Sequence, residues 1–155
     1  MVEPLLAALS EHVLVANGAM GSMLAAKGLR LMNSAAANAS APDVVREIFS
    51  EYRAAGATVF QSNTFAANGP MLRHAGLDGQ HDELNRLGVA LAREAVGDDC
   101  YVAGNIGPTG ELLRPLGLMS PAEAQEHFAR QTAVLLAAGV DFILLETFEA
   151  VEELE

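Results

Sequence analysis

Two stretches of the sequence share almost the same frame, AAGATVFQSNTF over residues 54–65 and AAGVDFILLETF over residues 137–148. In each, Ala-Ala-Gly precedes a short, mainly apolar run that ends in a polar residue followed by Thr-Phe. A glycine just after a helix commonly adopts the left-handed conformation that ends it, and a short apolar run between turn residues is typical of a buried strand. The frame therefore predicts a helix, a glycine cap and a strand, twice in one chain.

The residues before each copy support these two helices. Apolar residues recur at three- and four-residue steps over residues 44–52, and less strictly over residues 128–138. SAPD at 40–43 and SPAE at 120–123 each place a serine before a proline and an acidic residue, as at many helix N-termini. The serine and the glutamate of 120–123 also have the spacing of a capping box.

Two further apolar runs, HVLVANG over residues 12–18 and CYVAGNIGP over residues 100–108, have the same character. They do not alternate polar and apolar residues, which is typical of strands in a parallel sheet. The predicted strands end in polar residues at intervals of 46, 42 and 41 positions: Asn17, Asn63, Asn105 and Glu146. This regularity predicts about four βα units, and hence an α/β fold with a parallel sheet.

Two architectures accept this pattern, a doubly wound open sheet and a (β/α)8 barrel. A full barrel takes about 250 residues, so four units would form half of one. In both architectures ligands bind where the parallel strands end. An asparagine there often bonds loop backbone instead, whereas a carboxylate directly after FILL is costly to bury without a partner. Glu146 is therefore the strongest candidate for a binding residue.

Composition limits the class of protein and its partners. The 155 residues are 51% hydrophobic, which predicts one globular unit. The net charge of −11 would repel a nucleic acid. The chain contains no apolar run of the roughly 20 residues that a membrane span needs, and the first residues lack a basic targeting region. We therefore expect a cytoplasmic protein with no membrane or nucleic-acid partner.

Other familiar sites are not indicated. NGAMGSML lacks the glycine spacing of dinucleotide loops and the Lys of phosphate loops. The four histidines share no metal-ligand spacing, and we expect most of them at the surface. Cys100 is the only cysteine, so the chain cannot form an internal disulfide or a cysteine-rich zinc site. Because Asp98 and Asp99 would raise the pKa of its thiol, Cys100 is interpreted as a packing residue.

Four segments together resemble the homocysteine S-methyltransferase family, the barrel domain of cobalamin-dependent methionine synthase and betaine-homocysteine methyltransferase. They are NGAMGSML, NASAPDVVREIFSEYRAAGATVFQSNTFAAN, AGNIGPTGELLRPLG and AAGVDFILLETFEAVEE. The resemblance implies a (β/α)8 barrel, with residues 1–155 as its N-terminal half. It also implies that a zinc ion held by three cysteines activates the homocysteine thiol, which accepts a methyl group, with cobalamin as one carrier of that group, and yields methionine.

The resemblance assigns roles to residues. Glu146 matches the family's carboxylate at the end of the fourth strand, which would bind the amino group of homocysteine. Asn17 and Gly18 match the family's Asp-Gly after the first strand, and the neutral amide of Asn17 would bind an ammonium more weakly than a carboxylate. The remaining matched positions would line the pocket mouth: Asn63, Thr64, Phe65 and Asn105.

The family's zinc cysteines belong to the second half of the barrel, so the resemblance predicts no metal ligand in this chain. A half-barrel exposes two strand edges, which predicts completion by the missing half or by a second chain, as in a homo-oligomer. Three functions remain open. The chain is part of a homocysteine S-methyltransferase that is inactive alone, a non-catalytic half-barrel for binding or assembly, or another barrel enzyme that binds a small amino acid.

Overall fold

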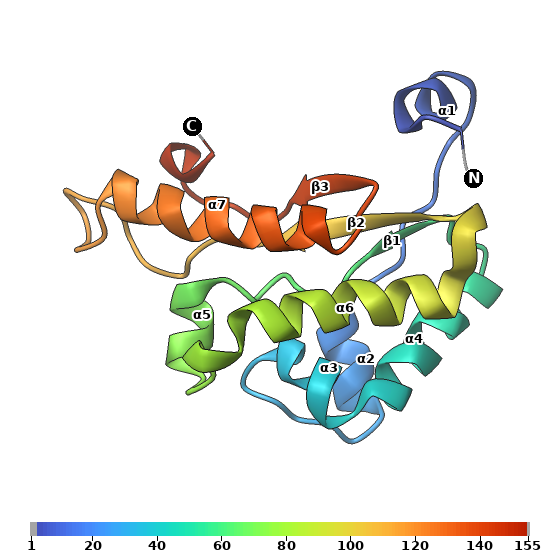
Figure 1. Ribbon diagram of the computed structural model, residues 1–155, viewed down its shortest axis with the longest axis horizontal. Helices are drawn as coiled ribbons and strands as arrows, with labels where there is room; N and C mark the ends of the chain where they lie inside the picture. Colours follow the sequence, from blue (N-terminus) through green and yellow to red (C-terminus); the bar gives the residue numbers. More distant parts are fainter. Residues whose placement is uncertain (1–2, 155) are drawn as a thin grey trace.

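A parallel sheet with its strands in sequential order organises the protein. The computed structural model describes residues 3–154, and within them the sheet contains β1 (Val59–Gln61), β2 (Tyr101–Ile106) and β3 (Phe142–Leu145). β2 lies in the centre and pairs in parallel with both neighbours. Figure 1 shows the three strands side by side, with their helices between them in the chain. The prediction of an α/β fold with a parallel sheet is confirmed.

The first predicted strand, residues 12–18, is reduced to one β-bridge between Ala16 and Val59. The Val15 carbonyl accepts bonds from Thr58 N at 2.8 Å and Val59 N at 3.1 Å, and Asn17 N donates to Val59 O at 2.9 Å. Regular pairing does not extend further along this edge. Val13 is 93% exposed, so it gains no packing energy that would hold it in a strand.

Three long helices and several short ones precede and connect the strands. The long helices are α4 (Pro42–Ala54), α6 (His81–Val96) and α7 (Pro121–Ala137). The short ones are α1 (Leu5–Glu11), α2 (Met20–Ala26), α3 (Ala37–Ser40) and α5 (Gly69–His74), with 3-10 turns at Ser34–Ala36, Asp78–Gln80, Gly97–Asp99 and Val151–Glu153.

The predicted helix signals are found at α4 and α7. Gly56 and Gly139, which follow these helices, have φ angles of 100° and 88°, in the left-handed region that glycine adopts without strain. At the start of α7, Ser120 and Glu123 form the reciprocal capping box. At α4 the residue that precedes the helix is Ala41 rather than Ser40, and the Ser40 hydroxyl bonds back to Ala36 O.

The two faces of the sheet pack differently. Phe60, Val102 and Ile106 point to one face, where α4, α6 and α7 cover them and form the main core. Val59 and Tyr101 are register partners and point to the opposite face, where they pack with Ala8 of α1. Figure 1 shows α1 set apart from the other helices, beyond one end of the sheet.

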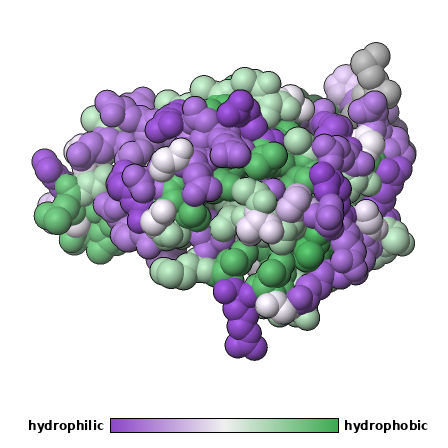
Figure 2. All heavy atoms as spheres, turned by 60° about the horizontal axis from the view of Figure 1, so that its bottom comes forward, coloured by the Kyte–Doolittle hydropathy of each residue, from purple (hydrophilic) through white to green (hydrophobic). Residues whose placement is uncertain are grey.

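The helical side of the molecule presents a mixed surface. Figure 2 shows hydrophilic side chains there surrounding smaller hydrophobic areas. None of the helices formed by residues 3–154 has the length and apolar character needed to cross a membrane.

Candidate functional site

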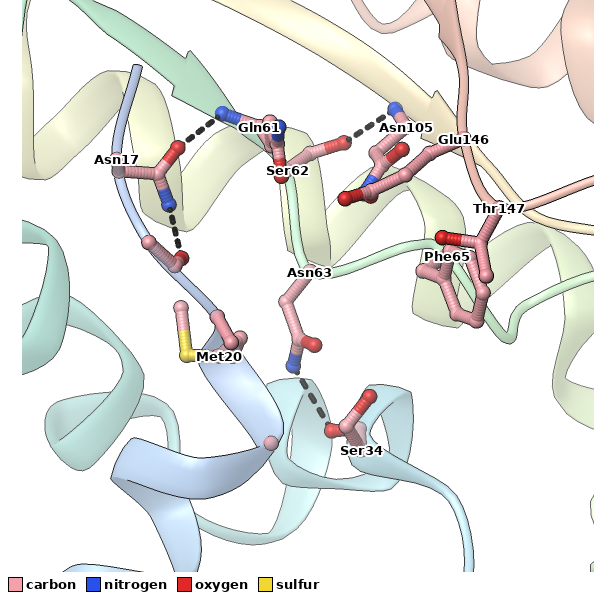
Figure 3. A pocket seen from close by; sticks show the side chains of 13 residues that line it. Asn17, Met20, Ser34, Gln61, Ser62, Asn63, Phe65, Asn105, Glu146 and Thr147 are labelled. Carbon is pink, nitrogen blue, oxygen red and sulfur yellow. Dashed lines mark hydrogen bonds between the residues drawn. The ribbon is translucent and has the colours of Figure 1, made fainter. Parts of the chain in front are cut away.

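A cavity of about 360 Å³ opens at the carboxyl ends of the strands. Its wall comes from the residues after each predicted strand and from the start of α2. Six of the seven predicted site residues line it: Asn17, Gly18, Asn63, Phe65, Asn105 and Glu146. Figure 3 shows the labelled members of this group converging from separate segments of the chain. Among the described lining residues, Glu146 is the only one with an ionisable side chain.

The register of the sheet places Asn105 beside Glu146. Asn105 pairs with Leu144, and since side chains alternate along a strand, Glu146 points to the same face as both. Glu146 N still donates to Ile106 O at 3.0 Å, so the pairing continues one residue past β3. Asn105 Nδ2 then donates a 2.8 Å hydrogen bond to Glu146 Oε2. The bond fixes the carboxylate at the cavity wall.

The second polar atom of Asn105 has no protein partner. Asn105 is 4% exposed, and its Oδ1 is buried without a hydrogen bond to any residue that the structure describes. A buried acceptor without a donor is unfavourable by about 1–3 kcal/mol. An acceptor of this kind next to a carboxylate suits a ligand that carries several N–H donors, as an ammonium group does.

Asn17 joins the first segment to the end of β1. Its Oδ1 accepts a 2.7 Å hydrogen bond from Gln61 N, and its Nδ2 donates to Gly18 O at 3.2 Å. Gly18 packs closely on Tyr52, because a Cβ there would lie 2.8 Å from the Tyr52 hydroxyl oxygen and the tyrosine would have to shift. Asn17 therefore bonds the backbone of β1 and of its own segment while it lines the cavity (Figure 3).

The loop after β1 is held by buried amides and hydroxyls. Asn63 Nδ2 donates to Ser34 O at 2.8 Å (Figure 3). It also donates to Asn38 Oδ1 at 2.8 Å. Thr64 Oγ1 donates to Asn105 O at 2.7 Å, and the threonine is fully buried. Thr64 is thus the one predicted site residue that lies outside the cavity wall, where it ties this loop to the end of β2.

Phe65 reaches the cavity because Gly107 leaves room for its ring. A Cβ at Gly107 would lie 2.4 Å from a carbon of that ring, which no real side chain tolerates. The phenyl ring therefore packs directly on backbone at the end of β2. This contact explains why the GNIGP segment has glycine at position 107.

Several lining residues were not predicted from the sequence. They are Ala19, Met20, Gly21, Ser34, Gln61, Ser62 and Thr147. Thr147 adopts φ 62°, which is rare for a β-branched residue and strained. Gln61 and Ser62 lie inside the repeated frame, so the same strand-end reasoning could have found them. No signal in the sequence points to Ser34 or to the φ angle of Thr147.

The side chains present do not fit a zinc site. Among residues 3–154, no group of three or more His, Cys, Asp or Glu could hold a metal ion. Cys100 lies just before β2 begins, away from the strand ends that form the cavity. Burial, followed by the nearby charge of Asp99, raises the pKa of its thiol, so it favours the protonated form, which is a poor metal ligand. We assign no reaction step to a metal bound by this chain.

Two of the four histidines, His12 and His74, are exposed as expected, whereas His81 and His127 are not. His81 is 2% exposed at the start of α6, and its Nδ1 lies 2.7 Å from Asp82 Oδ1. His127 on α7 is half-buried against Gly69, where a Cβ would lie 2.8 Å from its Nδ1. The packing of α5, α6 and α7 buries these rings, and a sequence pattern that reads one helix at a time does not include such contacts.

Comparison with known proteins places the chain in a family. A family model described as homocysteine S-methyltransferase matches residues 14–155. Methionine synthase of Mycobacterium tuberculosis is 32% identical over 97% of this chain and 14% of its own length. Betaine-homocysteine S-methyltransferase 1 of Danio rerio is 34% identical over 77% of this chain and 30% of its own length.

A solved structure has the same arrangement. The metallated form of the homocysteine methyltransferase MmuM from Escherichia coli superposes with a TM-score of 0.81 and 28% identity. The match covers 97% of this chain and 59% of that chain, so this chain spans less than two thirds of each of these relatives. The family model and the relatives agree along almost all of the described residues, and the chain belongs to the homocysteine S-methyltransferase family.

Proposed function

We propose that the chain is the N-terminal half of a (β/α)8 barrel that transfers a methyl group to the thiol of homocysteine and forms methionine. Three parallel strands in sequential order, with a bridged fourth segment at the edge, support the barrel. A doubly wound sheet reverses its strand order at a switch point, and these strands do not. Coverage of one sheet face by α4, α6 and α7 supports the same proposal, because barrel helices form an outer ring.

The single observation that carries the function is the cavity whose only ionisable lining side chain is Glu146, held by Asn105. The carboxylate accepts hydrogen bonds from the ammonium group of homocysteine, and charge-assisted bonds of this kind are about twice as strong as neutral ones. Asn105 Oδ1 offers one more acceptor beside it. The chain's role is to bind and orient the amino end of the substrate.

Asn17, Gly18, Asn63 and Phe65 shape the rest of the pocket in this proposal. Asn17 offers an amide where the family has a carboxylate, while Phe65 and Met20 supply apolar surface for the carbon chain. Thr64 supports the pocket from behind through its bond to Asn105 O. Zinc, which the family uses to activate the thiol, and the methyl donor, which in methionine synthase is carried by cobalamin, would be bound by residues outside this chain.

Completion of the barrel is a further part of the proposal. An apolar groove of about 850 Å³ runs along α7 and β3, lined by residues such as Phe128, Leu136 and Leu145. Leu136 and Leu145 are 56% and 51% exposed there. The relatives continue well beyond the matched part, so we assign this groove to a polypeptide that supplies the remaining barrel half. A second copy of the chain is the alternative that sedimentation analysis would reveal.

A ligand that lacks the α-amino group tests whether Glu146 binds the ammonium group of homocysteine. The 155-residue chain is titrated by calorimetry with L-homocysteine and with 4-mercaptobutyrate, which lacks only the α-amino group. We expect homocysteine to bind and the analogue to bind at least tenfold more weakly, as loss of a charge-assisted hydrogen bond requires. Equal affinity for the two would exclude an ammonium site at Glu146, and absence of homocysteine binding would favour a module that only assembles with another chain.

A further inference from the structure

A second hollow adjoins the candidate site. It has a volume of about 270 Å³ and lies between α2 and the segment that follows it. Gly21 and Ser34 line both hollows, so the two share a wall. Leu24, Leu29 and Leu31 give the second hollow apolar sides, and Arg30 is its only charged lining residue among those described.

Arg30 stands out among the basic residues. The chain has nine Lys and Arg residues, and Arg30 alone makes no hydrogen bond or ion pair with residues 3–154. The other eight each contact a carboxylate or a backbone carbonyl: Lys27, Arg46, Arg53, Arg73, Arg86, Arg93, Arg114 and Arg130. With 20 acidic residues in the chain, an uncommitted guanidinium beside a hollow is available to a ligand.

The two hollows together are dipolar. Glu146 supplies the negative charge of the first, and Arg30 supplies the positive charge of the second. The wall between them is low at Gly21, because a Cβ added there would meet no atom within 4 Å. No side chain therefore separates the two hollows at Gly21.

We propose that the Arg30 hollow binds the carboxylate of a small zwitterionic ligand in the candidate site. A planar carboxylate matches the two parallel donors of a guanidinium. A phosphate would bring a second negative charge that a single arginine does not neutralise, in a protein whose net charge is already −11. The identity of the neighbouring amino-binding site rests on the function proposed above, whereas carboxylate binding by Arg30 does not.

Two sources of the carboxylate fit this chemistry. It belongs either to the amino-acid substrate itself or to a second small molecule that donates the methyl group, such as betaine, the donor named in the relative from Danio rerio. Three probes separate them: L-homocysteine, 3-mercaptopropylamine, which lacks only the carboxylate of homocysteine, and glycine betaine. Each is titrated against the wild-type chain, Arg30→Gln and Arg86→Gln. Arg86 is a matched control because it is also exposed and bonds only the Asp82 carbonyl of its own helix.

We expect Arg30→Gln to weaken one carboxylate probe by about tenfold or more, with Arg86→Gln unchanged. Loss of homocysteine affinity with unchanged 3-mercaptopropylamine affinity assigns the hollow to the substrate. Loss of betaine affinity with unchanged homocysteine affinity assigns it to the donor. Wild-type affinity of Arg30→Gln for every probe, or no binding of any probe by the wild-type chain, overturns the proposal.

A second pair of variants tests the connection between the hollows. Gly21→Leu places a branched side chain at the shared wall, and Gly21→Ala adds only a methyl group in open space. We expect Gly21→Leu to weaken the same probe that Arg30→Gln weakens, and Gly21→Ala, which adds much less volume at the shared wall, to weaken it less. Thermal melting checks whether both variants fold. Unchanged binding by a folded Gly21→Leu would contradict a shared ligand. A wrong assignment of the ammonium site at Glu146 would be detected by a different result, which is equal affinity of the wild-type chain for homocysteine and 4-mercaptobutyrate.

Discussion

Asn105 and Glu146 lie at the ends of neighbouring strands, and a 2.8 Å hydrogen bond joins Asn105 Nδ2 to Glu146 Oε2. They are 41 residues apart in the chain, and the parallel register of β2 and β3 brings them together. The bond restricts the carboxylate to one orientation, and it leaves Asn105 Oδ1 buried without a described donor. The pair is therefore arranged to receive a donor group from the cavity.

Removal of the Asn105 side-chain amide should weaken ligand binding through its effect on Glu146. We predict that Asn105→Ala raises the Kd for homocysteine several-fold, because the carboxylate loses its fixed orientation and the ligand loses an acceptor. Titration calorimetry measures the effect. In a double-variant cycle, Asn105→Ala should have a smaller effect when Glu146 is already glutamine, because the two residues act together. Additive effects of the two changes would show that Asn105 works independently of Glu146.

Position 17 tests the carboxylate that the resemblance to the family predicts there. Asn17→Asp keeps the acceptor for Gln61 N and adds a charge at the cavity wall. We predict about fivefold tighter homocysteine binding, which is the difference between a neutral and a charge-assisted hydrogen bond. Asn17→Ala is the matched control, and it should lower the free energy of unfolding by about 1 kcal/mol because Gln61 N loses its partner. Unchanged or weaker binding by Asn17→Asp would place the ammonium elsewhere.

The capping box of α7 should contribute stability without affecting binding. Ser120 Oγ accepts a bond from Glu123 N at 3.2 Å, and Glu123 Oε2 accepts one from Ser120 N at 2.8 Å. Ser120→Ala should lower the free energy of unfolding by about 1 kcal/mol in urea denaturation. Ser50→Ala, which removes a hydroxyl bonded to Arg46 O within α4, is the control and should cost less. Equal losses would mean that the cap adds nothing specific.

His127 should make stability depend on pH. Burial, reinforced by the charge of Arg73, lowers the pKa of His127 in the folded protein. Between that lowered value and the unfolded value of about 6.5, the unfolded chain binds more protons, so stability falls as the pH decreases through this range. Denaturation between pH 7.5 and pH 5.5 should show a shallower decline for His127→Gln than for the wild type. An identical decline in both would remove His127 as its source.

Much of the fold could be predicted from the repeated frame, because the signals in that frame depend on neighbouring residues in the chain. The glycines after α4 and α7 and the cap at Ser120 depend on residues next to them in the chain. The regular spacing of the predicted strand ends indicated a parallel sheet, and the strands of the structure lie in sequential order. The first strand was overestimated, because an apolar run at an open edge, such as Val13, has no partner surface to hold it.

The candidate site was predicted in outline for the same reason. Strand ends in a parallel sheet share one edge, so Asn17, Asn105 and Glu146 could be placed together from the sequence. The burial of Thr64 and the inclusion of Ser34 could not, because both depend on how loops far apart in the chain pack on each other. The strained φ of Thr147 likewise has no sequence signal.

The most direct test compares the Kd of L-homocysteine for the wild-type chain, Glu146→Gln and the control Glu149→Gln, an exposed glutamate three residues further along that does not line the cavity. Glu146→Gln keeps the side-chain size and the bond from Asn105 but removes the charge. We predict a loss of about 1.5–3 kcal/mol, roughly 10- to 150-fold in Kd, with an unchanged melting temperature and no effect of Glu149→Gln. An unchanged Kd for Glu146→Gln, or a lowered melting temperature without a change in Kd, would show that this carboxylate only anchors its loop.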